Sequence, residues 1–307
     1  MTDLALILGA VLLAAAGGEA FLKSILGAAI HLRVPKIVVA TTLAAFATSA
    51  PELTVSTVAA LAGQPEIGLG DALGSNVVNI ALIFGLALLY RSVQASRQDF
   101  SRDFYLALAV PVLTFFLMLD GRIERPEALV LLAVFLTWLV WTVRSVLRQR
   151  AVAVDVEATE LSAGKSLLLG VLGLGALVAA GRLFVSGATG IAAALDVDTY
   201  VIGVLLVAIG TSLPELVTVI LSRLRGHDDV GVGTLIGSNL FNGLAIVGVA
   251  GTVHPIAAPL AEVAVTLACG IIALLLLLPN RRGQIVRGRG VLLLILYAGF
   301  VWATLDS

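Results

Sequence analysis

Ten apolar segments, most of them long enough to cross a bilayer, make up nearly the whole chain. A membrane-spanning helix needs roughly 20 apolar residues to cross about 30 Å of hydrocarbon. These segments are continuously apolar and lack the alternation that a barrel strand requires. Only 13% of the residues are charged, against about 25% in a typical soluble domain. The sequence therefore predicts an all-α polytopic membrane protein with ten transmembrane helices. The predicted segments are 4–30, 35–62, 68–90, 104–119, 126–147, 165–194, 199–225, 230–252, 256–279 and 290–305.

A polar interruption, "RQRAVAVDVEATELSAGK", separates the fifth segment from the sixth. It divides the chain into a first five-helix repeat (1–150), a cytoplasmic linker (151–164) and a second five-helix repeat (165–307). If the amino terminus lies outside, the loops on the inner side carry about 15 of the 19 lysines and arginines. Because cytoplasmic loops are enriched in these residues, both termini are predicted to lie outside.

Part of the chain is duplicated. A shift of 163 positions aligns "TSAPELTVSTVAALAGQPEIGLGDALGSNVVNIALIFGLA" with "TSLPELVTVILSRLRGHDDVGVGTLIGSNLFNGLAIVGVA", and about 16 of the 40 positions are identical. The motif regions are 41–87 and 204–250. Since each repeat has five helices, an odd number, the second repeat must be inverted relative to the first. Inverted repeats with interrupted helices are typical of secondary transporters, which bind their substrates near the bilayer midplane.

Each motif places a proline and a glutamate inside an apolar segment, Pro51 with Glu52 and Pro214 with Glu215. A proline interrupts a helix because it lacks the N–H that would bond to the carbonyl four residues earlier. Such a freed carbonyl is tolerated only where it is buried in protein or lines a watery cavity. A carboxylate within a membrane segment indicates a functional site. Two matched carboxylates predict a function more strongly than either would alone.

Hard oxygen donors gather around these glutamates, and no histidine or cysteine takes part, since the three histidines are predicted to fall in loops. Thr48 and Glu52 are one turn apart, so they share a helix face, as do Thr211 and Glu215. Oxygen ligands suit calcium and sodium, whereas zinc prefers nitrogen or sulfur. We therefore predict one midplane cation site with two carboxylates. The further side-chain donors are Ser49, Ser75, Asn79, Ser212, Ser238 and Asn242.

Two other ionisable residues, Glu19 and Arg182, occupy equivalent positions in the first and sixth segments. We interpret them as partners in ion pairs, either with each other or, for Glu19, with Lys23 one turn later. A second ion site or a proton relay is the alternative interpretation.

The two motifs, "ATSAPE…GSNVVN" and "GTSLPE…GSNLFN", resemble the paired motifs of the cation/calcium exchanger superfamily, most closely those of the prokaryotic sodium/calcium exchangers. The resemblance implies sodium-for-calcium antiport by alternating access, in which helices 1 and 6 slide against the other eight. It implies that Glu52 and Glu215 ligate the ions, with hydroxyls from the Thr-Ser pairs, Ser75 and Ser238. The backbone carbonyls of Ala45 and Ala208 are implied as further ligands.

The chain departs from the superfamily motifs at two positions, and alternative functions remain open. Ala47 stands where the superfamily has glycine, and Asn242 stands where potassium-dependent relatives carry aspartate. A proton/calcium antiporter, or one for another divalent cation, is the nearest alternative, although the intact Thr-Ser pairs favour sodium. A remote alternative is an intramembrane aspartyl protease, because Gly68–Asp71 reads "GLGD"; that chemistry needs a second intramembrane aspartate, which the sequence lacks.

The remaining expectations concern partners and location. We expect a non-enzymatic transporter without a cofactor, in the plasma (inner) membrane of a prokaryote. Its partners are membrane lipid and the transported cations. The sequence contains no basic cluster interleaved with aromatic residues that would bind nucleic acid, and it indicates no obligatory protein partner.

Overall fold

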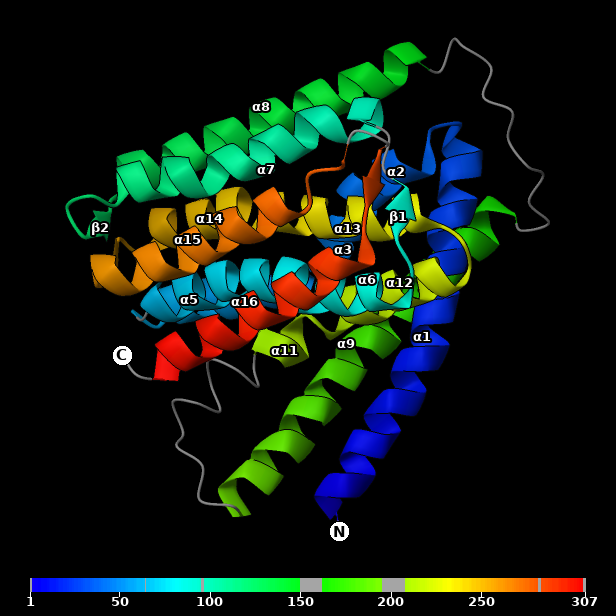
Figure 1. The fold of residues 1–307 in the computed structure, drawn as a ribbon, viewed down its shortest axis with the longest axis horizontal. Coiled ribbons are helices and arrows are strands. Elements are labelled where there is room, and N and C mark those ends of the chain that lie inside the picture. The colour runs from blue at the N-terminus through cyan, green and yellow to red at the C-terminus, as the bar shows by residue number, and fades with distance from the viewer. Residues whose placement is uncertain are drawn as a thin grey trace. The chain divides into compact units, whose positions relative to one another are not determined.

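The structure is a computed structural model that describes residues 2–63, 65–94, 97–149, 162–194, 208–280 and 283–305. The described chain is helical apart from four two-residue strands (Figure 1). The elements before residue 150 are α1 (Thr2–Leu32), α2 (Lys36–Val39), the π-helix η1 (Ala40–Ala44), α3 (Ala45–Thr48), α4 (Ala50–Leu61), α5 (Pro65–Val77), the π-helix η2 (Val78–Phe84), α6 (Gly85–Tyr90), β1 (Val93–Gln94), α7 (Arg97–Leu117), β2 (Arg122–Ile123) and α8 (Arg125–Gln149). The later elements are α9 (Ala163–Ala194), α11 (Ala208–Thr211), α12 (Leu213–Leu224), α13 (Asp228–Leu240), the π-helix η4 (Phe241–Ile246), α14 (Val247–Val253), β3 (Ile256–Ala257), α15 (Leu260–Leu276), β4 (Gln284–Ile285) and α16 (Arg287–Leu305).

The duplicated sequence forms duplicated local structure. Elements α3, α4 and α5 recur 163 residues later as α11, α12 and α13, with the same bounds after the shift. The π-helix η2 likewise recurs as η4, which ends one residue short of the shifted bound. The same residues in the same order therefore produce the same breaks in the helix, wherever they occur in the chain.

Two short antiparallel ladders join the first repeat to the second. Strand β1 pairs with β4, and β2 pairs with β3. The shift of 163 residues carries β1 onto β3, and β2 onto β4 within one residue. The two ladders therefore exchange places when the repeats are exchanged, as expected for two halves related by a two-fold axis. Each ladder is only two residues long and lies between helices, so the fold remains mostly helical.

Five described helices are long and apolar enough to cross a membrane, and a bent pair would make a sixth. The five spans are 3–32, 65–90, 125–145, 163–183 and 228–253, and the bent pair joins 36–48 to 50–61. The predicted segments coincide with observed helices to within four residues, except that α7 begins seven residues early. Residues 199–207 of the seventh predicted segment lie outside the described residues. The number of ten spans and the orientation of the termini therefore remain predictions.

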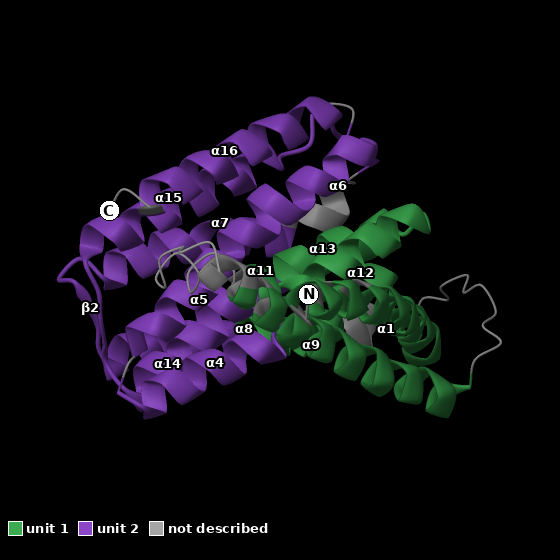
Figure 2. Cartoon of the chain, turned by 90° about the horizontal axis from the view of Figure 1, so that it is seen from below, with its two compact units in different colours: residues 1–48, 136–237 green, residues 49–135, 238–307 purple. Residues whose placement is uncertain are grey.

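The chain divides into two compact units, and each draws on both repeats (Figure 2). The first unit contains residues 1–48 and 136–237. In it α1 lies along α9 (Figure 1), and small residues allow the close approach. A Cβ atom on Gly173 would lie 2.6 Å from the backbone nitrogen of Phe21, and one on Gly17 would lie 2.7 Å from the Cβ of Ala176. Glycines at such positions let two membrane helices pack backbone against backbone.

The second unit contains residues 49–135 and 238–307. Its interior is apolar around η2, where Ile80 and Phe84 are at most 1% exposed. Helices α15 and α16 pack against this segment. The rings of Phe135 and Phe241 meet edge to face at 4.8 Å. This packing places the two π-helices, η2 and η4, among well-buried neighbours.

Candidate functional site

Both motif helices are interrupted at a serine. Helix α3 ends at Thr48 and α4 begins at Ala50, and between them Ser49 has φ −84° and ψ 7°. The two segments meet at a bend of 43°. In the second motif Ser212 separates α11 from α12 with φ −82° and ψ 9°. The predicted interruption of the helix is therefore confirmed in both motifs.

The prolines follow these breaks and lie in the first turn of the new helix, Pro51 in α4 and Pro214 in α12. In a first turn the missing N–H of proline costs little, since that group would have no partner within the helix. The first helical bonds run from the N–H of Leu53 to the carbonyl of Ser49, at 3.1 Å, and from Leu216 to Ser212, at 3.0 Å. Each proline thus ends one helix and begins the next.

The motif glutamates are buried within the first turn of these helices. Glu52 and Glu215 are each 1% exposed. A helix amino terminus favours a carboxylate through its dipole. Burial nevertheless costs several kcal/mol for each ionised group unless other charges and dipoles compensate it. A bound cation is one such compensation, so two buried carboxylates at equivalent places fit a cation-binding function.

Within the first unit, α3 of the first motif contacts α12 of the second. This contact brings the helix that carries Ala45 and Thr48 against the helix that carries Glu215. Thr48 is fully buried, and its hydroxyl donates to the carbonyl of Ala45 at 3.3 Å. Ser212 is also fully buried. Thr211 is partly buried, and Ala208 begins α11; of Ala208 only the backbone is described.

Within the second unit, α4 packs against η4. The helix that begins next to Ser49 and contains Glu52 thereby contacts the segment that contains Asn242. The remaining predicted donors of this unit are at most 2% exposed: Ser49, Ser75, Asn79, Ser238 and Asn242. Each unit therefore combines predicted donors from both repeats.

Several of these buried atoms have no hydrogen-bond partner among the described residues. They are the Oγ of Ser75, the Oδ1 of Asn79, and both amide atoms of Asn242. A buried polar atom without a partner costs about 1–3 kcal/mol. Three of the four atoms are oxygens that can accept from water or coordinate a cation. No group of three or more His, Cys, Asp or Glu residues lies together in the described chain.

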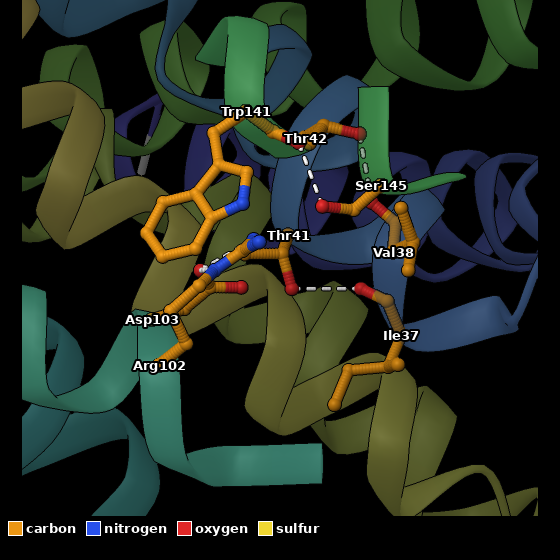
Figure 3. Close-up of polar contacts among 8 residues, drawn as sticks. All are labelled: Ile37, Val38, Thr41, Thr42, Arg102, Asp103, Trp141 and Ser145. Atoms are coloured by element: carbon orange, nitrogen blue, oxygen red, sulfur yellow. Dashed lines mark hydrogen bonds and ion pairs between the residues drawn. The ribbon is translucent and has the colours of Figure 1, made fainter. Parts of the chain in front are cut away.

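The predicted ligands Asn79 and Asn242 lie in the π-helices η2 and η4. A third π-helix, η1, precedes the first break. Near it the hydroxyls of Thr41 and Thr42 donate to the carbonyls of Ile37 and Val38, each at 2.7 Å (Figure 3). Hydroxyl bonds to the preceding turn bend helices, and π-segments often occur at functional sites. The repeat equivalent of η1, residues 203–207, lies outside the described residues.

Asn76 and Asn239 are matched positions of the repeat that were not among the predicted donors. They form a reciprocal pair within the second unit. The Nδ2 of Asn76 donates to the carbonyl of Asn239 at 3.3 Å, and the Nδ2 of Asn239 donates to the carbonyl of Asn76 at 3.2 Å. Asn79 joins this pair through its Nδ2, which donates to the Oδ1 of Asn239 at 3.1 Å. Both motifs have asparagine at this position, and this match was the sequence signal that could have identified the pair.

Glu19 forms two ion pairs in the first unit. Lys23 lies 3.4 Å from it, as one of the two interpretations predicted, and Arg225 at the end of α12 lies 2.9 Å from it. The alternative partner, Arg182, is exposed and makes no ion pair with Glu19 in the described chain. Of the two pairings left open for Glu19, the described chain therefore contains the one with Lys23 and not the one with Arg182.

Nearly the whole chain is similar to known proteins. Residues 2–144 and 165–305 match a family described as "Sodium/calcium exchanger protein". The chain is 32% identical to the "Putative antiporter CaxA" of Alkalimonas amylolytica, with 90% of each chain covered. It is 29% identical to the "Sodium/calcium exchanger MaX1" of Methanosarcina acetivorans, with 97% of each covered. A solved structure of the sodium-calcium exchanger NCX_Mj superposes with a TM-score of 0.85 at 29% identity, covering 99% of each chain.

Proposed function

Because the chain belongs to the sodium/calcium exchanger protein family, we propose that it exchanges sodium for calcium across the plasma membrane of a prokaryotic cell. The family consists of cation/calcium antiporters, which are multi-pass membrane proteins and not enzymes, so the protease alternative is excluded. Relatives of similar length are named an antiporter and a sodium/calcium exchanger. Ions are the substrates of such a protein, and it has no cofactor.

The observation that carries the proposal is the repeated combination of a helix break and a buried carboxylate. Glu52 and Glu215 each follow a serine that interrupts a membrane segment. In this proposal the predicted donors of both motifs form one cation site. The side-chain ligands are Glu52, Glu215, Thr48, Ser49, Thr211, Ser212, Ser75, Ser238, Asn79 and Asn242, joined by the carbonyls of Ala45 and Ala208.

Transport then requires the site to open to one side of the membrane at a time. In the proposed mechanism α1 and α9, the first and sixth of ten helices, slide against the others, with both termini outside. The close glycine contacts between α1 and α9 support movement of the two helices as one body. The surrounding lipid is the expected partner of their exposed faces.

The coupling ion is the finer part of the proposal. Sodium is favoured over protons because both motifs retain the Thr-Ser pair, whose hydroxyls suit a hard monovalent cation. In the first motif the hydroxyl of Thr48 and the carbonyl of Ala45 already lie next to each other. A proton-coupled antiporter would need only the carboxylates, which can protonate when calcium leaves.

The deciding experiment measures calcium-45 uptake by proteoliposomes that contain the purified chain. Uptake is driven first by an outward sodium gradient and then by an outward proton gradient of equal size. We expect uptake under the sodium gradient alone. Uptake under the proton gradient alone would mean that the proposed cation site is retained and that protons, not sodium, are the coupling ion. No uptake under either gradient would mean that the chain transports another cation.

A further inference from the structure

The reciprocal pair of Asn76 and Asn239 determines how each of these two amide groups is oriented. A backbone carbonyl only accepts hydrogen bonds, so the atom of Asn239 that faces the carbonyl of Asn76 must be its Nδ2. The Oδ1 of Asn239 is then the atom that remains for other contacts. The same argument fixes Asn76, whose Nδ2 faces the carbonyl of Asn239.

The orientation of the Asn239 amide in turn determines the orientation of the Asn79 amide. Only a donor can satisfy the Oδ1 of Asn239, and Asn79 supplies its Nδ2 at 3.1 Å. The Oδ1 of Asn79 therefore points away from Asn239. It is buried and accepts no hydrogen bond from any described residue. Were the amide of Asn79 turned over, two oxygens would face each other at this contact, which is unfavourable.

We propose that Asn239 is a positioning residue for ion transport, which turns the amide of Asn79 so that its oxygen, and not its nitrogen, faces the transported cation. The inference rests on the proposed function, in which Asn79 is a ligand. An amide nitrogen carries hydrogens and repels a cation, so a ligand of fixed orientation binds more tightly than one that must first turn over.

The second repeat lacks the equivalent contact. By symmetry the Nδ2 of Asn242 would donate to the Oδ1 of Asn76. Both atoms are instead buried without a hydrogen-bond partner among the described residues. Next to Asn76 lies a small cavity, also lined by Asn239 and Thr266, with room of about 20 Å³ for the centres of water molecules. This is enough for one water molecule. Asn76 therefore does not orient Asn242 as Asn239 orients Asn79.

The asymmetry supplies a matched control for the experiment. Asn239→Ala and Asn76→Ala each remove one hydrogen bond to a backbone carbonyl of the other repeat. Only Asn239→Ala also releases a predicted ligand. We therefore expect Asn239→Ala to raise the calcium concentration for half-maximal uptake by about 3- to 10-fold, the range of one neutral hydrogen bond. We expect Asn76→Ala to raise it by less than about 2-fold.

Measurements in a chain that also carries Asn79→Asp separate a positioning role of Asn239 from a structural one. An aspartate at position 79 has two equivalent oxygens, so its orientation no longer matters. In the Asn79→Asp chain a carboxylate oxygen faces the Oδ1 of Asn239, so we expect Asn239→Ala to leave the half-maximal calcium concentration unchanged or to lower it relative to that background. A purely structural loss would persist unchanged there. Equal effects of Asn239→Ala and Asn76→Ala, or an undiminished effect in the Asn79→Asp background, would overturn the proposal.

A further variant covers the case in which Asn239→Ala does not fold. Asn239→Asp keeps an acceptor for the Nδ2 of Asn79 but cannot donate to the carbonyl of Asn76. Half-maximal calcium uptake within about 2-fold of the wild type supports positioning, and a loss of about 3-fold or more contradicts it. The wild type is measured in the same assay. If it takes up no calcium, the proposed function fails; if it does and the variants behave alike, only the positioning role fails.

Discussion

The two repeats have nearly the same backbone at their motifs and differ in the contacts that their side chains make. Ser49 and Ser212 agree to within 2° in both φ and ψ, and α4 and α12 have equivalent bounds. Yet Asn79 bonds to the opposite repeat, whereas Asn242 does not. An 18-residue apolar stretch within the span 65–90 has 78% of its residues buried, whereas the equivalent stretch within the span 228–253 has 100% buried. The motifs thus dictate where the helices break, and the neighbours of each motif decide how it packs.

This comparison separates positions at which the two repeats must be alike from positions at which they can differ. Identical residues are needed where both repeats must offer the same group, as with the two glutamates. Elsewhere the repeats have diverged, since Glu19 in one corresponds to Arg182 in the other. A transporter whose halves were truly identical would have equal energies for its inward-open and outward-open states. Contacts that occur in one repeat alone are therefore the ones that can favour one state over the other.

The largest effect is expected where the repeats are alike. Glu52→Gln and Glu215→Gln each remove a buried carboxylate, and each should reduce sodium-driven calcium-45 uptake by about 100-fold or more, because one charge-assisted ligand to a divalent ion is lost. Both variants should reach the membrane and purify as the wild type does. If one of them retains substantial uptake, the two carboxylates do not share one site, and the repeats differ in function as well as in packing.

A smaller effect should distinguish two equivalent glycines. A Cβ atom on Gly237 would clash with the carbonyl oxygen of Thr41 and would lie 2.6 Å from the Cβ of Ala45, whereas a Cβ on Gly74 would meet no atom within 4 Å. We expect Gly237→Ala to lower the free energy of unfolding by about 1–3 kcal/mol, the usual cost of overpacking. Gly74→Ala should be neutral or stabilising by up to about 1 kcal/mol, because alanine favours a helix.

Thermal unfolding of both variants in the same detergent measures this difference. Each should also be assayed for calcium uptake, because Gly237 packs against the segment that carries Ala45, a predicted ligand. An equal loss of stability in the two variants would mean that the close packing around Gly237 is not specific to the second repeat.

The sequence was sufficient for the features that depend on local chemistry. Proline lacks a donor, so the breaks next to Pro51 and Pro214 could be predicted, although proline alone is not sufficient, since Pro111 lies inside α7. Continuous apolar runs predicted the helix bounds to within four residues, except at the start of α7. The π-helices could not be predicted, because their wider hydrogen-bonding pattern depends on the packing of the surrounding helices. The bond from Asn79 to Asn239 joins residues 160 positions apart. The repeat marked Asn239 as unusual, but only the fold shows which atom it contacts.

The smallest effect is expected at the ion pair between Glu19 and Arg225, which exists in one repeat only, since the residue equivalent to Arg225 is Ala62. The side chain of Arg225 is 58% exposed and that of Glu19 is 29% exposed, so the pair stabilises the fold by about 0.2–1 kcal/mol.

Arg225→Gln should lower the free energy of unfolding by that amount in dilute buffer, while Glu19 keeps Lys23 as a partner. Arg182→Gln, at the position in α9 that is equivalent to Glu19, should have no measurable effect. Adding choline chloride to about 1 M should abolish the difference between Arg225→Gln and the wild type, because salt screens exposed charges at that concentration. A difference that persists at high salt would mean that the pair is shielded from solvent, and that α1 is held to α12 more firmly than its exposure indicates.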